Sequence, residues 1–234
     1  MVKEASLGHR QGRPPAPSAF FRIFSEGPEQ QQPFRVTLTW WAVGGYTSCH
    51  SDPNMFDCSV VTGLGPVIIS YNSSSSLWTN ASAEALTGTG SSVWAQLQNV
   101  PFGGSDGVNL IFGGGIAPEN SGTPNDPVVL GFDHIYMYDP ASKNFLNQTA
   151  SESTSGSLPQ PRNGFYSVGA PGSNGTYEIF IYGGASSAWS DDTALEQSDE
   201  VFILSLPGFV WFKVDVPHTG GQRAQHTCNL IGNS

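Results

Sequence analysis

The sequence predicts an all-β protein in which one small antiparallel sheet is repeated along the chain. The first observation is a glycine pair that ends an apolar stretch three times, at intervals of 69 and 70 residues: Gly44-Gly45, Gly113-Gly114 and Gly183-Gly184. The second is a pair of large side chains, seven residues apart, that follows each glycine pair: Tyr71 and Trp78, Tyr138 and Phe145, Leu204 and Trp211. The third is composition, because 12% charged residues with 28 glycines and 17 prolines favour strands and turns over helices.

Each repeat is predicted to hold up to four antiparallel strands, with the glycine pair after the second strand. In the third repeat the expected strands are 165–169, 177–182, 200–205 and 209–214. In the second repeat they are 93–100, 107–112, 133–138 and 144–148, and in the first 35–43, 66–71 and 76–80. A glycine pair suits a tight exit from a strand, where a positive φ angle and close backbone approach exclude a Cβ atom.

The strands 177–182 and 200–205 are almost wholly apolar, which indicates burial on both faces. Small four-stranded sheets that pack radially around a channel are the blades of a β-propeller. We therefore predict an incomplete propeller over residues 35–234, with three four-stranded blades at about 35–90, 91–160 and 161–221. Arg223 lies 61 residues after Arg162, so residues 222–234 are expected to begin a fourth blade. Residues 1–34 show no periodicity and are interpreted as a disordered or spurious segment.

Three tryptophans receive specific predictions. Trp78 and Trp211 stand at the repeat position and are expected to fill the core between neighbouring blades, each burying roughly 150–250 Å². Trp189 lies in the loop that follows the third glycine pair. It is the candidate for an exposed contact with a partner, and the alternative is that it packs against the edge of its blade.

The chain offers no motif typical of a metal, cofactor or catalytic site. The glycine run 112–116 is not followed by Lys-Ser, Lys-Thr or a helix, so it is interpreted as a strand-end turn rather than a phosphate loop. The five histidines follow no HxH or HExxH spacing, and the acidic loop 191–200 lacks the ligand spacing of an EF-hand. We expect no cofactor, no metal and no enzymatic activity.

The net charge of −10 and the pI near 4.7 argue against nucleic acid as a partner. The nine Lys and Arg residues form no basic stripe that could neutralise a phosphate backbone.

Cysteines and sequons point to an extracellular or cell-surface setting. Cys49 and Cys58 bracket eight residues and are predicted to form a disulfide in an oxidising compartment, since the spacing lacks the CxxC knuckle of a zinc site. Four Asn-X-Ser/Thr sequons are predicted glycosylation sites, at Asn72, Asn80, Asn147 and Asn174. Residues 1–34 contain no signal peptide, and no run of eighteen apolar residues predicts a membrane span.

The repeat resembles the kelch repeat, in which an apolar strand ending in Gly-Gly precedes a Tyr strand and a Trp six or seven residues later. The segments 174–184 (NGTYEIFIYGG), 201–214 (VFILSLPGFVWFKV) and 226–233 (HTCNLIGN) are similar to secreted or membrane-anchored kelch proteins of fungi, which are grouped with galactose-oxidase-like propellers. The resemblance covers roughly residues 36–234. It implies a ring of six or seven blades, and in relatives a cysteine often stands at the position of Tyr166 as a partner for the one that matches Cys228.

The resemblance implies a non-enzymatic scaffold that binds a protein partner through the loops of its blades. The long loops 115–132 and 185–199 are the candidates, because rigid sheets leave such loops available for contacts. The alternative is a galactose-oxidase-like or glycan-binding propeller whose active residues lie in blades beyond this sequence.

Overall fold

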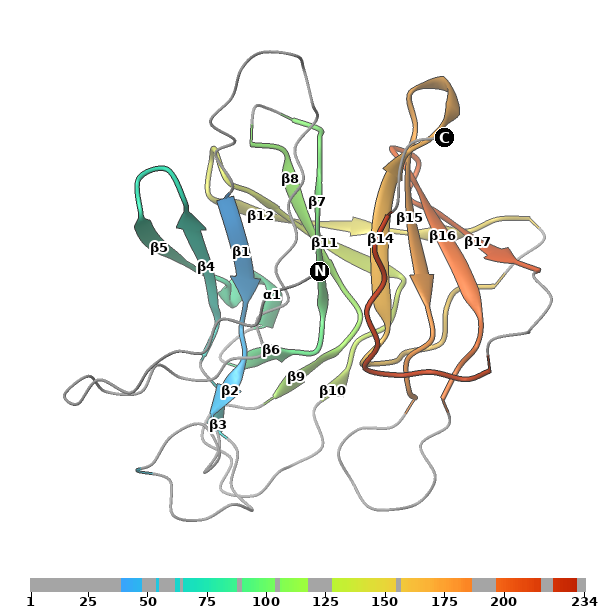
Figure 1. Cartoon of the computed structure of the whole chain (residues 1–234), viewed down its shortest axis with the longest axis horizontal. Coiled ribbons are helices and arrows are strands. Elements are labelled where there is room, and N and C mark those ends of the chain that lie inside the picture. Colours follow the sequence, from blue (N-terminus) through green and yellow to red (C-terminus); the bar gives the residue numbers. More distant parts are fainter. Residues whose placement is uncertain are drawn as a thin grey trace, which may run out of the picture.

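The computed structural model describes residues 39–47, 54, 62–63, 65–87, 90–103, 106–117, 128–154, 157–186, 197–215 and 221–230. The predictions for residues 1–34, for Cys49 and Cys58, and for Trp189 fall outside the described residues. Within them the chain is all-β, as predicted, and consists of three larger sheets that lie side by side (Figure 1). Among these residues the only α-helix has four residues, so none of them forms a helix that is long and apolar enough to cross a membrane.

The first sheet has three antiparallel strands among the described residues, in the order β1-β4-β5. They are β1 (Thr39–Val43), β4 (Val67–Asn72) and β5 (Leu77–Ser82). The paired side chains of the repeat stand directly opposite each other, with Tyr71 across from Trp78. A short helix that the sequence analysis did not predict, α1 (Glu84–Thr87), leads out of this sheet.

The second sheet has four antiparallel strands in the order β12-β11-β8-β7. They are β7 (Gln96–Val100), β8 (Val108–Phe112), β11 (His134–Asp139) and β12 (Asn144–Thr149). These bounds agree with the predicted strands within three residues at every end. Tyr138 stands across from Phe145, as Tyr71 does from Trp78.

The third sheet has the predicted four strands and one more. The predicted strands are β14 (Tyr166–Pro171), β15 (Tyr177–Tyr182), β16 (Val201–Leu206) and β17 (Val210–Val214), with a 3-10 turn, η1 (Ser173–Gly175), between the first two. The added strand, β13 (Ser151–Glu152), pairs in parallel with the outer edge of β17. Chain that leaves the second sheet therefore contributes to the third.

Two minor sheets complete the described strands. One joins β6 (Ser91–Val93), β9 (Gly115–Ala117) and β10 (Val128–Val129), in the order β10-β9-β6. The other joins β2 (Tyr46–Thr47) and β3 (Thr62–Gly63). In each case the first strand after a glycine pair turns back at the end of a large sheet.

The glycine pairs occupy equivalent settings at the junctions between sheets. Both glycines of every pair have positive φ angles, from +61° to +115°. The amide of the second glycine donates to a carbonyl that opens the next unit: Gly45 N to Ser92 O at 2.8 Å, Gly114 N to Arg162 O at 3.1 Å, and Gly184 N to Arg223 O at 2.8 Å. A Cβ atom at Gly114 would collide with the backbone of Ala95 and Val93. The predicted reason for the glycines, positive φ with close backbone approach, is confirmed.

An aromatic core joins the second and third sheets. Phe112, Phe132, Phe165 and Trp211 are at most 1% exposed, and their ring centroids lie 5.3–6.3 Å apart. The indole N–H of Trp211 donates to the carbonyl of Phe132 at 2.9 Å, so the one polar atom of that ring is also satisfied. The prediction that Trp211 fills the gap between neighbouring sheets is confirmed.

A second, smaller core joins the first and second sheets. Ile68, Leu86, Ile111 and Tyr138 are buried there, with Trp41, Val43, Leu97 and Phe145 packed against them. The rings of Trp41 and Tyr138 meet edge to face, with 5.7 Å between their centroids. The repeated Tyr138–Phe145 pair thus faces the sheet that precedes it, and Trp211 does the same one unit later.

Two predictions about packing and strands are wrong. Trp78 is 65% exposed rather than buried, because the face of the first sheet that carries it does not meet the second sheet. Residues 221–230, expected to enter the first strand of a fourth blade, form no strand. They pass the start of β14 instead, where the amide of Gln225 donates to the carbonyl of Gly164, two residues before that strand, at 2.7 Å (Figure 1).

Candidate functional site

The loop between β15 and β16 is one of the two predicted contact loops, and both ends of it are described. Its stem consists of residues 183–186 and 197–200, while 187–196, with Trp189, lie outside the described residues. The two sides are joined by a bridge between Ala185 and Gln197 and by the amide of Ser198, which donates to Gly184 O at 2.8 Å. The stem therefore closes as an antiparallel pair.

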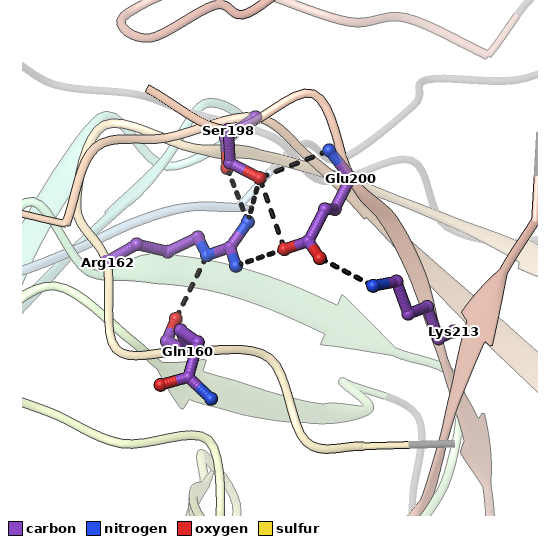
Figure 2. Close-up of polar contacts among 6 residues, drawn as sticks. Gln160, Arg162, Ser198, Glu200 and Lys213 are labelled. Carbon is purple, nitrogen blue, oxygen red and sulfur yellow. Dashed lines mark hydrogen bonds and ion pairs between the residues drawn. The ribbon is translucent and has the colours of Figure 1, made fainter. Parts of the chain in front are cut away.

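A single buried arginine, Arg162, clamps this stem (Figure 2). Its side chain is 4% exposed. Nη1 donates to the carbonyl of Gly183 at 3.3 Å and to Ser198 Oγ at 2.7 Å, so it bonds to both sides of the stem. Nη2 donates to Glu200 Oε2 at 2.9 Å, and Nε donates to the carbonyl of Gln160 at 2.9 Å. Because these donors already serve protein acceptors, the guanidinium holds the stem rather than presenting itself to a ligand.

Glu200 completes the clamp between two cations. Its Oε1 accepts a hydrogen bond from Lys213 Nζ at 2.7 Å, and its other oxygen is held by Arg162. Partial burial acts to raise the pKa of Glu200, but the hydrogen bonds and charges of Lys213 and Arg162 outweigh it and lower that pKa from 4.5 to about 2. The carboxylate is therefore ionised at neutral pH.

The clamp also links the stem to the neighbouring units. The carbonyl of Arg162 accepts the amide of Gly114 at the end of the second sheet. The amide of Arg223 donates to the carbonyl of Ser198 at 3.2 Å. The guanidinium lies 5.6 Å from the ring centroid of Phe202 in the buried core. The loop thus rises from a point where the second sheet, the third sheet and the segment 221–230 meet.

Sequence reasoning found Arg162 only as a marker of the repeat and missed its role. Ser198 and Glu200 were considered only as part of the acidic loop 191–200, which lacks the ligand spacing of an EF-hand. The signal that existed was chemical: an arginine that follows a proline opens the third unit in a chain with only nine Lys and Arg residues, and an acidic residue immediately precedes β16. The pairing spans 38 residues, so no local pattern reveals it.

The other predicted contact loop, residues 115–132, has a similar stem. Strands β9 and β10 pair at its two ends, and the amide of Leu130 donates to the carbonyl of Gly114 at 2.9 Å. Residues 118–127 lie outside the described part of the chain. Among the described residues, Arg162 meets this stem through its backbone, because its carbonyl accepts the amide of Gly114 at 3.1 Å.

The sequon asparagines lie on turns and outer strands. Asn80, Asn147 and Asn174 are exposed, and Asn72 is half-buried. Asn72 Oδ1 accepts the amides of Ser74 and Ser75, each at 3.0 Å, and so shapes the turn before β5. Asn147 Oδ1 lies 3.1 Å from His134 Nδ1. Whether any of them carries a glycan stays a prediction.

Among the residues that the structure describes, no three His, Cys, Asp or Glu side chains gather as metal ligands. His134 lies beside Asp133, with 3.7 Å between Nε2 and Oδ2, on an exposed strand end. No family model matches this sequence, and no curated protein matches it either.

Proposed function

We propose that the chain is a non-enzymatic scaffold with kelch-type propeller blades, which binds a protein partner through the loop between β15 and β16. The observation that carries the proposal is the Arg162 clamp. One buried side chain bonds to both ends of this loop, and its backbone carbonyl accepts a bond from the second glycine pair. A loop fixed at its stem loses less conformational freedom when its tip binds, which favours affinity.

The kelch-type architecture is supported by the repeated junctions. Three glycine pairs make the same backbone bond to the unit that follows, and two successive sheets pack with their pair of large side chains towards the preceding sheet. The three exposed sequon asparagines fit an extracellular or cell-surface setting, which we include in the proposal.

The test is site-specific capture of the partner. A photo-crosslinking amino acid, p-benzoylphenylalanine, replaces Trp189, and the matched control carries it at Leu146, which is 56% exposed on the second sheet. We expect a partner to be captured from position 189 and not from 146. The partner captured at 189 must then bind the unlabelled chain in a direct titration.

A loop variant completes the test. Residues 187–196 are replaced by Gly-Gly, which leaves Ser198, Glu200 and the Ala185–Gln197 bridge intact. A wider deletion of 185–199 would remove Ser198 and disturb Arg162, so it would not separate binding from folding. Binding of the captured partner should be lost with an unchanged circular dichroism spectrum. Undiminished binding would refute the loop assignment. Oxidation by O2 of galactose to its aldehyde, or of glyoxal to glyoxylic acid, with release of hydrogen peroxide from the metal-loaded chain, would favour the enzymatic alternative.

A further inference from the structure

Two apolar sheet faces take no part in either core. The outer face of the first sheet carries alternate residues of its three strands: Trp40, Ala42, Val67, Ile69, Tyr71 and Trp78. Trp40 is 37% exposed and Trp78 is 65% exposed. We call this the leading face, because it bears the large side-chain pair of the repeat. Large exposed aromatic residues on a flat strand surface are typical of a surface that is covered by another sheet or protein.

The outer face of the third sheet is also apolar. A row of directly paired residues crosses four of its strands: Val168, Phe180, Ile203 and Phe212. Phe180 is 38% exposed and Phe212 is 43% exposed. We call this the trailing face. At one end of it the ring of His226 covers Tyr166 and Tyr182, with centroids 6.4 and 5.2 Å away.

Both internal interfaces join a leading face to a trailing face. The leading face of the second sheet, with Tyr138 and Phe145, packs on the first sheet's trailing face, with Ile68 and Trp41. The leading face of the third sheet, with Leu204 and Trp211, packs on the second sheet's trailing face, with Phe112 and Ile135. The open face of the first sheet is therefore a leading face, and the open face of the third sheet is a trailing face. Within the molecule, a face of each kind already packs against a face of the other kind.

The inner strands show the same complementarity. The carbonyls of Ser92, Arg162 and Arg223 all accept the amide of a second glycine. Ser92 and Arg162 stand four residues before β7 and β14, the innermost strands of their sheets, so Thr227 marks where the next inner strand should begin. Residues 227–230 form no strand. The first sheet, in its described part, has no strand beyond β1 at the corresponding edge.

We propose that two copies of this chain associate head to tail, so that the trailing face of each packs on the leading face of the other. A two-fold axis then relates two identical contacts and closes a ring of six large sheets, within the four to eight blades that propellers use. Residues 227–230 of each copy lie along β1 of its partner and supply the inner strand of the first sheet. This proposal does not depend on the contact loop, and either can fail alone.

The experiment is native mass spectrometry and multi-angle light scattering of the full chain. We expect a dimer with twice the 24.9 kDa mass of the chain at micromolar concentration. Trp78→Ser on the leading face and Phe180→Ser on the trailing face should each raise the dimer dissociation constant about tenfold or more. Leu146→Ser is the matched control, since this leucine is 56% exposed but belongs to neither open face, and it should leave the constant unchanged.

Mixing the two variants separates head-to-tail pairing from pairing of like faces. A heterodimer of Trp78→Ser with Phe180→Ser chains retains one contact between two intact faces, whereas each variant homodimer has none. We expect the heterodimer to dominate the mixture. A monomeric wild-type chain, a dimer weakened by only one of the two substitutions, or a mixture without heterodimer enrichment would each overturn the proposal.

Discussion

Trp78 and Trp211 occupy the same position of the repeat but have opposite surroundings. Each stands on the last strand of its sheet, directly across from the other member of its pair. Trp211 is fully buried between Phe112 and Phe132, whereas Trp78 is 65% exposed. The repeat therefore places a large side chain on the leading face of each sheet. Whether that side chain is buried depends on the preceding sheet, which only the second and third sheets have in the described structure.

Replacing each of these two tryptophans with alanine tests the comparison with the largest expected effect. Trp211→Ala should lower the free energy of unfolding by about 3–5 kcal/mol, because it removes an aromatic ring from a packed core. Trp78→Ala should lower it by only about 0.5–1 kcal/mol in the monomer, because the exposed ring loses mainly its cross-strand contact with Tyr71, with 4.7 Å between the ring centroids. Chemical denaturation of the dilute chain measures both values. Comparable losses would mean that Trp78 is packed in solution.

The glycines at the junctions offer a second, intermediate test. Gly114 and Gly175 both have positive φ angles, +69° and +78°. A methyl group at Gly114 would collide with the backbone of the neighbouring strand, whereas at Gly175 there is nothing within 4 Å. Gly175→Ala should cost about 1–2 kcal/mol for the backbone conformation alone. Gly114→Ala should cost about 1–3 kcal/mol more, because of the added collision. Equal losses of unfolding free energy for the two variants in urea denaturation would show that the junction between the sheets can accommodate the added methyl group.

The smallest expected effect concerns Glu200 and acid stability. Its pKa of about 2 in the folded chain lies below the ordinary 4.5, so its ionised form stabilises the fold above pH 4.5. That contribution falls as the pH drops from 4.5 towards 2. In Glu200→Gln it is absent at every pH, which we expect to cost about 1–2 kcal/mol at neutral pH after solvent screening. The two chains should converge in stability near pH 2. A constant difference across this range would rule out the proposed coupling to Arg162 and Lys213.

Strand positions were predictable from the sequence because turns and apolar runs are local signals. All four strands of the second sheet lie where proline, glycine and asparagine interrupt alternating or continuous apolar segments. The glycine pairs were assigned correctly for the same reason, since positive φ depends on the backbone at one or two residues. The composition alone indicated an all-β chain.

Features that depend on distant partners were not predictable in this way. Strand β13 has two polar residues, Ser151 and Glu152, and exists only because the edge of β17 accepts it. The bond between Arg162 and Glu200 depends on a register between units that no spacing reveals. Trp78 was predicted to be buried because of its position in the repeat. Burial, however, requires a preceding sheet to pack against, and the repeat itself does not provide one.

Strand β13 has a consequence for how such units could be exchanged or excised. The amides of Ser151 and Ser153 donate to the carbonyls of Phe209 and Trp211. The outer edge of the third sheet is therefore paired with residues that belong to the second repeat of the sequence. A fragment cut at the repeat boundary near residue 161 would leave the β17 edge open to the pairing that leads to aggregation. A fragment that starts at Ala150 would retain β13 and its pairing with the edge of β17. The structural unit therefore begins before the sequence repeat does. A repeat that is moved to another protein must include the segment before it, which supplies the strand at its outer edge.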